Sequence, residues 1–184
     1  VLEDYAFLAQ GALRVYEATG RVQPLVFALE LTRAIRREFW DPDRETLFYT
    51  PTSGDTLPVR PQEVADQSTP SSMGIAVQVL LAMDAFDPDE GFGDIAETVL
   101  QTHAATIRDA PMQHPSLVRA ADIQEHGHLE LTISAADPPA EWLEFVGERY
   151  LPDRLLAPRP PDEDTLDEWV AALDLSAAPP IWAG

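Results

Sequence analysis

Cysteine and lysine are both absent from this sequence of 184 residues. Without cysteine the chain cannot form a disulfide, supply a thiol nucleophile or build a cysteine-ligated zinc site. Without lysine, arginine provides all 12 of the basic residues. The length and the hydrophobic share of 45% are typical of one globular domain, and we expect a small appendage beside it.

Long apolar stretches are absent as well. No segment approaches the about 20 apolar residues that a membrane-spanning helix needs. No signal peptide precedes the first helical pattern, so we expect a cytoplasmic location. The sequence begins inside that pattern without an initiating Met, and we therefore expect it to be a piece of a longer protein.

Positive charge is scarce, with 12 basic residues against 32 acidic ones and a net charge of −20. Small soluble domains usually carry a net charge of magnitude about 2–8. Molar salt shortens the Debye length to ~3 Å and screens such self-repulsion, so we expect a halophile's protein. An acidic mesophilic protein is the alternative. The same negative field repels phosphate backbones and anionic lipids, and we expect neither nucleic-acid nor membrane partners.

Apolar residues recur with helical spacing along most of the chain, so we expect a mainly helical fold. The expected helices cover residues 4–19, 24–39, 70–86, 91–107 and 115–125. The inward stripe of the first is expected to hold Leu8, Ala12, Val15 and Tyr16, and that of the second Leu25, Ala28, Leu29, Thr32 and Ile35. The third, expected to be capped by Thr69 with Pro70 next, is apolar on nearly all sides and should be buried.

Two pairs of short strands are also expected. Residues 47–50 and 56–59 have strand character and are joined through Ser53-Gly54-Asp55. Further on, an alternating stretch over 128–134, a helix to about Tyr150 and a stretch at 154–157 predict a parallel βαβ unit. A last helix is expected over residues 164–173. The predicted division is 1–127 for helical hairpins, 128–157 for the βαβ unit, and 158–184 for a linker and C-terminal helix.

Buried and half-exposed helices alternate, since the helices starting near residues 4 and 70 are each followed by an amphipathic one. This predicts two concentric layers, and the pattern resembles part of the (α/α)6 toroid of six-hairpin glycosidases and N-acylglucosamine 2-epimerases. Three stretches are more specific: LEDYAFLAQGALRVYEATG (2–20), EFWDPDRETLFYT (38–50) and VRPQEVADQSTPSS (59–72). They resemble the C-terminal region of the thioredoxin-domain-containing proteins named, in mammals, for spermatogenesis association.

This resemblance implies that a thioredoxin-like domain and the first toroid hairpins lie upstream in the same longer chain. It implies a fold more firmly than an activity. The chain departs from the family at Ser71-Ser72-Met73-Gly74, where the family has Ser-Gly-Asn-Ser, so any role of that Asn does not transfer.

Two helix starts are the candidate site. In such toroids the inner helices start at the mouth of a central cavity, which places Asp4 and Asp66 at one funnel. Two carboxylates about 5–9.5 Å apart can hydrolyse a glycosidic bond, and tuned acids can also epimerise a sugar. We predict Asp4 and Asp66 as a catalytic pair. The predicted ligand-binding residues are Tyr5 and Trp40, which would stack on a sugar ring, Arg60, which would hold a carboxylate or orient Asp66, and Ser68 and Thr69.

Structural roles compete with this prediction. Asp4 suits the positive end of a helix, and Ser68 and Thr69 are ordinary capping residues. Arg60 and Asp66 would then form a structural ion pair.

The histidines carry weaker signals. His103 lies on an apolar stripe and is expected to be packed, and His114 is expected in a loop. His126 and His128 could share a metal ion, but no third ligand is evident. We predict no metal site and no cofactor.

Three hypotheses follow. The chain is part of a carbohydrate-active enzyme, a hydrolase or epimerase, or it is a non-catalytic scaffold or binding module attached to the thioredoxin-like part. A metal-binding module is the third. The expected partners are a sugar or other small molecule, the upstream part of the same chain, and a second copy through an exposed apolar seam.

Overall fold

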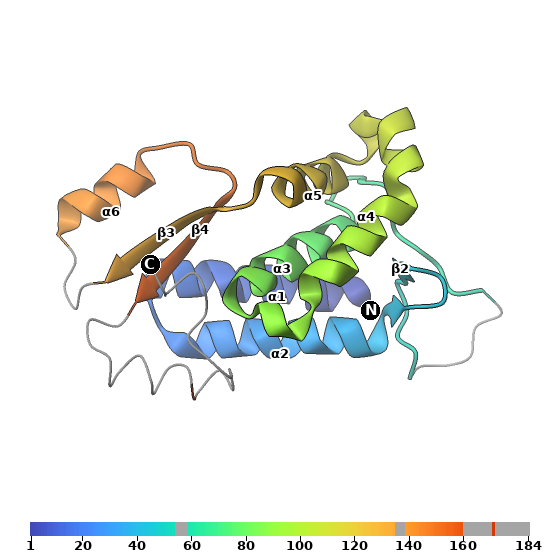
Figure 1. Ribbon diagram of the computed structural model, residues 1–184, viewed down its shortest axis with the longest axis horizontal. Helices are drawn as coiled ribbons and strands as arrows, with labels where there is room; N and C mark the ends of the chain where they lie inside the picture. The colour runs from blue at the N-terminus through green and yellow to red at the C-terminus, as the bar shows by residue number, and fades with distance from the viewer. Residues whose placement is uncertain (54–58, 135–138, 160–170, 172–184) are drawn as a thin grey trace.

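Helices make up most of the computed structural model, which describes residues 1–53, 59–134, 139–159 and 171 (Figure 1). The helices are α1 (Leu2–Thr19), α2 (Val22–Glu38), α3 (Ser72–Phe86), α4 (Phe92–Asp109), α5 (Pro115–His126) and α6 (Ala140–Gly147), with short 3-10 turns η1 (Pro88–Glu90) and η2 (Pro111–Gln113). The strands are β1 (Trp40–Asp41), β2 (Thr46–Leu47), β3 (Leu129–Ser134) and β4 (Arg154–Arg159). The prediction of a mainly helical chain is confirmed.

A left-handed glycine separates α1 from α2. Gly20 has φ of 66°, and its N–H donates to the Tyr16 carbonyl at 2.8 Å. Residues with a Cβ rarely adopt this conformation, which is why the helix ends here. The buried residues of α2 include every member of the predicted inner stripe. Both predicted helices are therefore confirmed to within a few residues.

The predicted inner stripe of α1 is wrong at two positions. Leu8 and Val15 are 54% and 49% exposed. The buried apolar residues of α1 are instead Leu2, Ala6, Ala9, Leu13 and Tyr16. The helix has apolar side chains on more than one face, and its spacing alone does not indicate which face meets α2 and α3.

Helix α3 is the centre of the helical part, in contact with α1, α2, α4 and α5. Its residues from Ser72 to Met83 are all buried, as its sequence predicts. The predicted cap is wrong, because Ser71, not Thr69, caps the helix. The Ser71 Oγ accepts a hydrogen bond from the Gly74 N–H at 2.9 Å, so the loop continues two residues further than expected.

The first strand pair also differs from the prediction. Trp40–Asp41 pairs antiparallel with Thr46–Leu47 around the turn that starts at Asp41, instead of residues 47–50 pairing with 56–59. The Asp41 Oδ1 accepts from the backbone N–H of Asp43 and Arg44 and closes this turn locally. The predicted strand over 56–59 and the predicted helix over 164–173 lie almost entirely outside the described residues.

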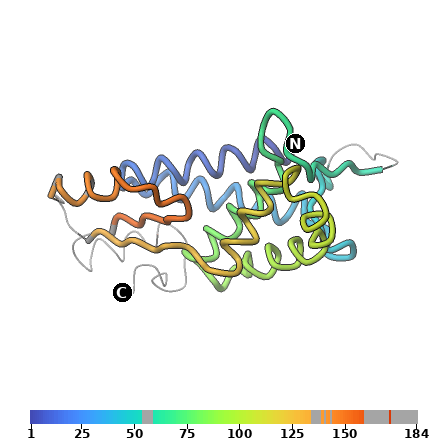
Figure 2. The backbone as a smooth tube through the Cα atoms, turned by 90° about the horizontal axis from the view of Figure 1, so that it is seen from above, coloured from blue at the N-terminus to red at the C-terminus, as the bar shows by residue number. Residues whose placement is uncertain are grey.

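The predicted parallel unit is present, with β3 and β4 paired in parallel and α6 between them in the chain. Figures 1 and 2 show this unit at one end of the helical part. Strand β4 contacts α1, where the Leu156 N–H donates to the Glu17 Oε1 at 3.0 Å. The predicted division at residue 127 stays a prediction. No helix within the described ranges combines the length and apolarity needed to cross a membrane.

Candidate functional site

An open pocket of about 480 Å³ lies under the loop that precedes α3. Residues 66–70 of this loop form one wall. The other walls come from Gln10 of α1, from Ile75 and Gln78 of α3, and from the start of α5 at Pro115 and Ser116. The predicted loop therefore faces a cavity at the start of a buried helix. We call it the outer pocket.

Asp66 holds this loop in place. Its Oδ1 accepts from the Ser71 N–H at 2.8 Å and from the Ser116 hydroxyl, and its Oδ2 accepts from the Ser116 N–H at 3.0 Å. One carboxylate thus joins the loop to the starts of two helices, where the helix dipoles favour negative charge. Both oxygens are committed to structural hydrogen bonds.

Ser68 and Thr69 line the outer pocket beside Gln67, and all three are exposed. The Gln67 N–H donates to the Thr69 carbonyl at 2.9 Å, which closes the loop on itself. The described structure assigns no hydrogen bond to either hydroxyl, so both are available to a ligand. Their assignment as ligand-binding residues stays a prediction, now with a pocket at the predicted place.

The other predicted site residues do not line this pocket. The Asp4 side chain is 67% exposed, and its Oδ2 lies 2.9 Å from the Val1 nitrogen. The Tyr5 ring packs edge-on against Phe39, with 5.2 Å between ring centroids. Trp40 is partly buried against the core in β1. The pairing of Asp4 with Asp66 in catalysis stays a prediction that these contacts do not favour.

Arg60 makes structural contacts, and its predicted role in binding a ligand stays a prediction. Its Nη2 donates to the Thr50 carbonyl at 2.6 Å, and its guanidinium lies 4.4 Å from the centroid of the Phe48 ring. Its nearest carboxylate among the described residues is Asp41, at 3.9 Å, and not Asp66. Arg60 therefore ties the loop to the β1–β2 hairpin.

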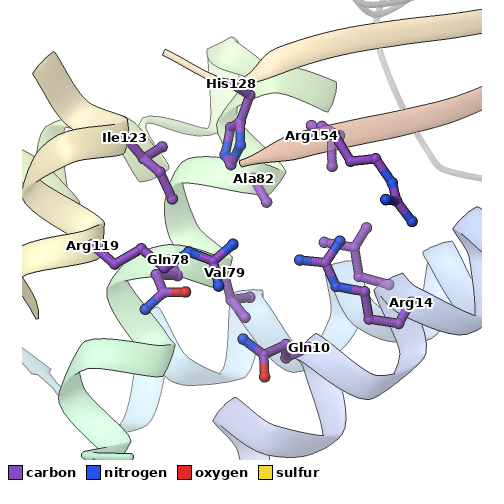
Figure 3. A pocket seen from close by; sticks show the side chains of 11 residues that line it. Gln10, Arg14, Gln78, Val79, Ala82, Arg119, Ile123, His128 and Arg154 are labelled. Atoms are coloured by element: carbon purple, nitrogen blue, oxygen red, sulfur yellow. The ribbon is translucent and has the colours of Figure 1, made fainter. Parts of the chain in front are cut away.

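A second and smaller pocket of about 20 Å³ adjoins the first, and we call it the inner pocket. The two pockets share Gln10, Gln78 and Arg119. Figure 3 shows Arg14 of α1 and Arg119 of α5 pointing toward each other across it, with Arg154 of β4 and the His128 ring beside them. The sequence analysis missed these arginines, because nothing local indicates that α1, α5 and β4 meet.

His128 enters the inner pocket from the segment before β3. Its Nδ1 lies 3.1 Å from the Asp153 carbonyl, which can only accept, so Nδ1 carries the hydrogen. Burial lowers the pKa of His128, outweighing the raising effect of Asp153. The ring is therefore neutral at pH 7, and its buried Nε2, which has no partner among the described residues, presents a lone pair.

The remaining histidines have local partners. His103 is buried as predicted, with its Nε2 2.8 Å from the Thr46 hydroxyl. His114 lies in the loop position between η2 and α5, as predicted, but it is buried, with its Nδ1 2.9 Å from the Ala110 carbonyl. His126 pairs with Asp122 one turn earlier, away from the inner pocket. Within the described part of the chain, no three His, Asp or Glu residues are grouped closely enough to hold a metal ion.

Comparison with known proteins agrees with the resemblance that the sequence motifs carry. No family model matches the chain. Spermatogenesis-associated protein 20 from Mus musculus is 29% identical over 160 residues, which is 84% of this chain. The proteins of that name from Rattus norvegicus and Homo sapiens match to the same extent. The chain is homologous to part of these proteins. It spans about a fifth of their length, since the match covers 20% of each.

Proposed function

We propose that this chain is a helical binding module of a longer protein, and that its outer pocket takes a small hydroxylated molecule. The observation that carries the proposal is the outer pocket, of about 480 Å³, lined by Ser68, Thr69 and the side-chain amides of Gln10 and Gln67. Ligand pockets usually measure about 300–1,000 Å³ and carry a few convergent polar groups. Hydroxyl and amide groups can donate to and accept from a polyol or a sugar.

Binding is better supported than sugar hydrolysis. Among the described residues, Asp66 is the one carboxylate that lines the outer pocket, and its oxygens already accept three hydrogen bonds. Hydrolysis by the usual route needs a second carboxylate as acid, base or nucleophile. Asp4 does not line the pocket. A carbohydrate-active enzyme would therefore need a group from another part of the longer protein.

We also propose that α1–α2 and α3–α4 are two hairpins of an (α/α)6 toroid, with α1 and α3 in the inner layer. The contacts of α1 with α3 and of each with its own amphipathic partner support this. The upstream part of the longer protein, including a thioredoxin-like domain, would supply the missing hairpins and cover Leu8 and Val15. The net charge of −20 supports a halophile's cytoplasm as the setting.

Sorbitol, a neutral polyol, is the probe that tests the outer pocket. Its binding to the whole chain would be followed by amide chemical-shift changes in wild type and in the double variant Ser68→Ala, Thr69→Val. Loss of two hydrogen bonds is expected to weaken binding about tenfold. Thr98→Val is the matched control, because the Thr98 hydroxyl donates only to the Asp94 carbonyl in its own helix. Unchanged affinity of the double variant would contradict the proposal.

A further inference from the structure

Positive charge is concentrated at the inner pocket of an otherwise strongly acidic molecule. Three of the 12 arginines, Arg14, Arg119 and Arg154, line it, and no carboxylate side chain of the described residues does. The chain as a whole carries a net charge of −20.

Two of these arginines have carboxylate partners. Arg14 pairs with Glu17 at 2.5 Å, and the Arg119 Nε donates to the Asp153 Oδ1 at 3.1 Å. Each carboxylate also has a position fixed by the fold, since Glu17 accepts from the backbone of β4 and Asp153 directly precedes that strand. These partners hold the two guanidinium groups beside the pocket.

Arg154 is the uncompensated cation of the group. No carboxylate of the described residues lies within ion-pair distance of it, and its Nε is buried without a hydrogen-bond partner. An unpaired buried donor costs about 1–3 kcal/mol of stability, more when it is charged. A guanidinium also presents a planar set of donors that matches the two oxygens of a carboxylate. Arg154 therefore has the features of a ligand-binding group more than those of a stabilising one.

His128 requires a hydrogen-bond donor on the ligand. Its unpartnered Nε2 faces the same pocket and accepts a hydrogen bond, which a carboxylate oxygen cannot supply. A hydroxyl group on the carbon next to the carboxylate can supply it. The volume of about 20 Å³ admits about two water-sized atoms, so one carboxylate oxygen and the neighbouring hydroxyl can enter while the carbon chain stays at the mouth.

We propose that the inner pocket binds the carboxylate of an α-hydroxy acid. The arginines that line the pocket receive the carboxylate oxygens, and the adjacent hydroxyl donates to the His128 Nε2. The hydroxylated remainder of the ligand extends past Gln10 and Gln78, which the two pockets share, into the outer pocket. This inference rests on the proposed function of the outer pocket and names the ligand class.

Gluconate and sorbitol make a matched test, because they differ at one end by a carboxylate in place of a CH₂OH group. Binding of each to the whole chain would be measured by calorimetry at one fixed ionic strength. Gluconate is expected to bind at least tenfold more tightly than sorbitol. Arg154→Gln is expected to remove that preference and leave sorbitol binding unchanged. Arg108→Gln is the matched control, because it removes the same charge from an exposed pair on α4.

A second variant keeps the test valid if Arg154→Gln fails to fold. Gln10→Glu adds a negative charge where the pockets meet, on a partly exposed helical position where either residue is a good helix former. It is expected to weaken gluconate binding more than sorbitol binding, because the added charge repels the carboxylate. 2-Deoxygluconate lacks only the hydroxyl beside the carboxylate, and is expected to bind severalfold more weakly than gluconate.

The outcomes separate the two proposals. Equal binding of gluconate and sorbitol, or a preference that survives both Arg154→Gln and Gln10→Glu, overturns the carboxylate site and leaves the outer pocket standing. Gluconate binding that depends on Arg154 without any sorbitol binding supports the inner pocket and counts against the outer one. Tighter binding of sorbitol 6-phosphate than of gluconate overturns the choice of a carboxylate, and equal binding of 2-deoxygluconate overturns the role of His128. Absence of all binding overturns both proposals.

Discussion

At the scale of single residues, Asp66 illustrates how one side chain connects distant parts of the fold. It accepts hydrogen bonds from Ser71 five residues ahead and from Ser116 fifty residues ahead. A carboxylate with such partners stabilises the folded chain because its removal leaves buried N–H groups unpaired. This structural role differs from that of a catalytic acid. It predicts that removing the carboxylate lowers the stability of the fold.

Asp66→Asn should lower the free energy of unfolding by about 1–3 kcal/mol, because an amide NH₂ cannot accept from the Ser116 N–H. Asp4→Asn makes the same change on an exposed side chain and should alter stability by less than about 0.5 kcal/mol. Urea unfolding of both variants at one salt concentration measures the difference. Equal effects at the two positions would refute the structural role of Asp66.

Gly74 is the second residue on which the site depends. A Cβ at this position would collide with the Ser116 side chain and lie 2.9 Å from the Ser71 Oγ. Gly74→Ala should therefore cost about 1–3 kcal/mol, because α5 must move away from α3. Gly11→Ala on α1 meets nothing within 4 Å and should instead stabilise by about 0.5–1 kcal/mol. Thermal unfolding of both variants tests the opposite signs.

At the scale of elements, the buried contact between α4 and β2 makes stability depend on pH. The His103 Nε2 lies 2.8 Å from the Thr46 hydroxyl. Burial lowers the pKa of His103, and His114 lowers it further. Below its ordinary pKa of about 6.5 the unfolded chain binds a proton that the folded chain resists. The free energy of unfolding therefore falls as the pH drops through this region toward the lower folded pKa.

His103→Gln should flatten this dependence when urea unfolding is compared between about pH 7.5 and about pH 5.5. His128, whose pKa burial also lowers, should account for part of the slope that remains. His126→Gln is the control, since the side chain of His126 is 71% exposed. A slope that is the same in wild type and His103→Gln would contradict the contribution of His103.

Helix α1 has an exposed apolar face, which the sequence pattern predicted to be buried. Its face with Leu8 and Val15 leaves both side chains about half exposed. In dilute buffer we expect self-association through this face, because removing apolar area from water is favourable. Light scattering should show smaller particles for Leu8→Glu, Val15→Glu. Met112→Glu, at a 91% exposed residue of η2, should leave the size unchanged. A monomeric wild type would rule this face out as an interface between copies.

At the scale of the whole molecule, the net charge of −20 opposes compaction. Raising KCl from about 0.1 M to about 1 M shortens the Debye length from ~10 Å to ~3 Å and should raise the unfolding midpoint. An uncharged osmolyte at equal osmolality should raise it less. A midpoint independent of KCl would contradict adaptation to salt.

The helices, the buried character of α3, the parallel βαβ unit and the acidic surface could all be predicted from the sequence. Each of these depends on the spacing of neighbouring residues or on composition, which a sequence displays directly. The sequence also indicated that residues 66–69 belong to a loop over a buried helix.

Which groups meet at that loop depends on how distant elements pack, and the sequence did not predict it. Asp66 is hydrogen-bonded to Ser116 and not to Arg60. The buried face of α1 excludes Leu8 and Val15. Arg14 and Arg154 line one pocket although 140 positions separate them in the sequence. Local periodicity carries no information on such pairs, because they result from the way α1, α3, α5 and β4 pack together. The inner pocket exists only where those elements converge.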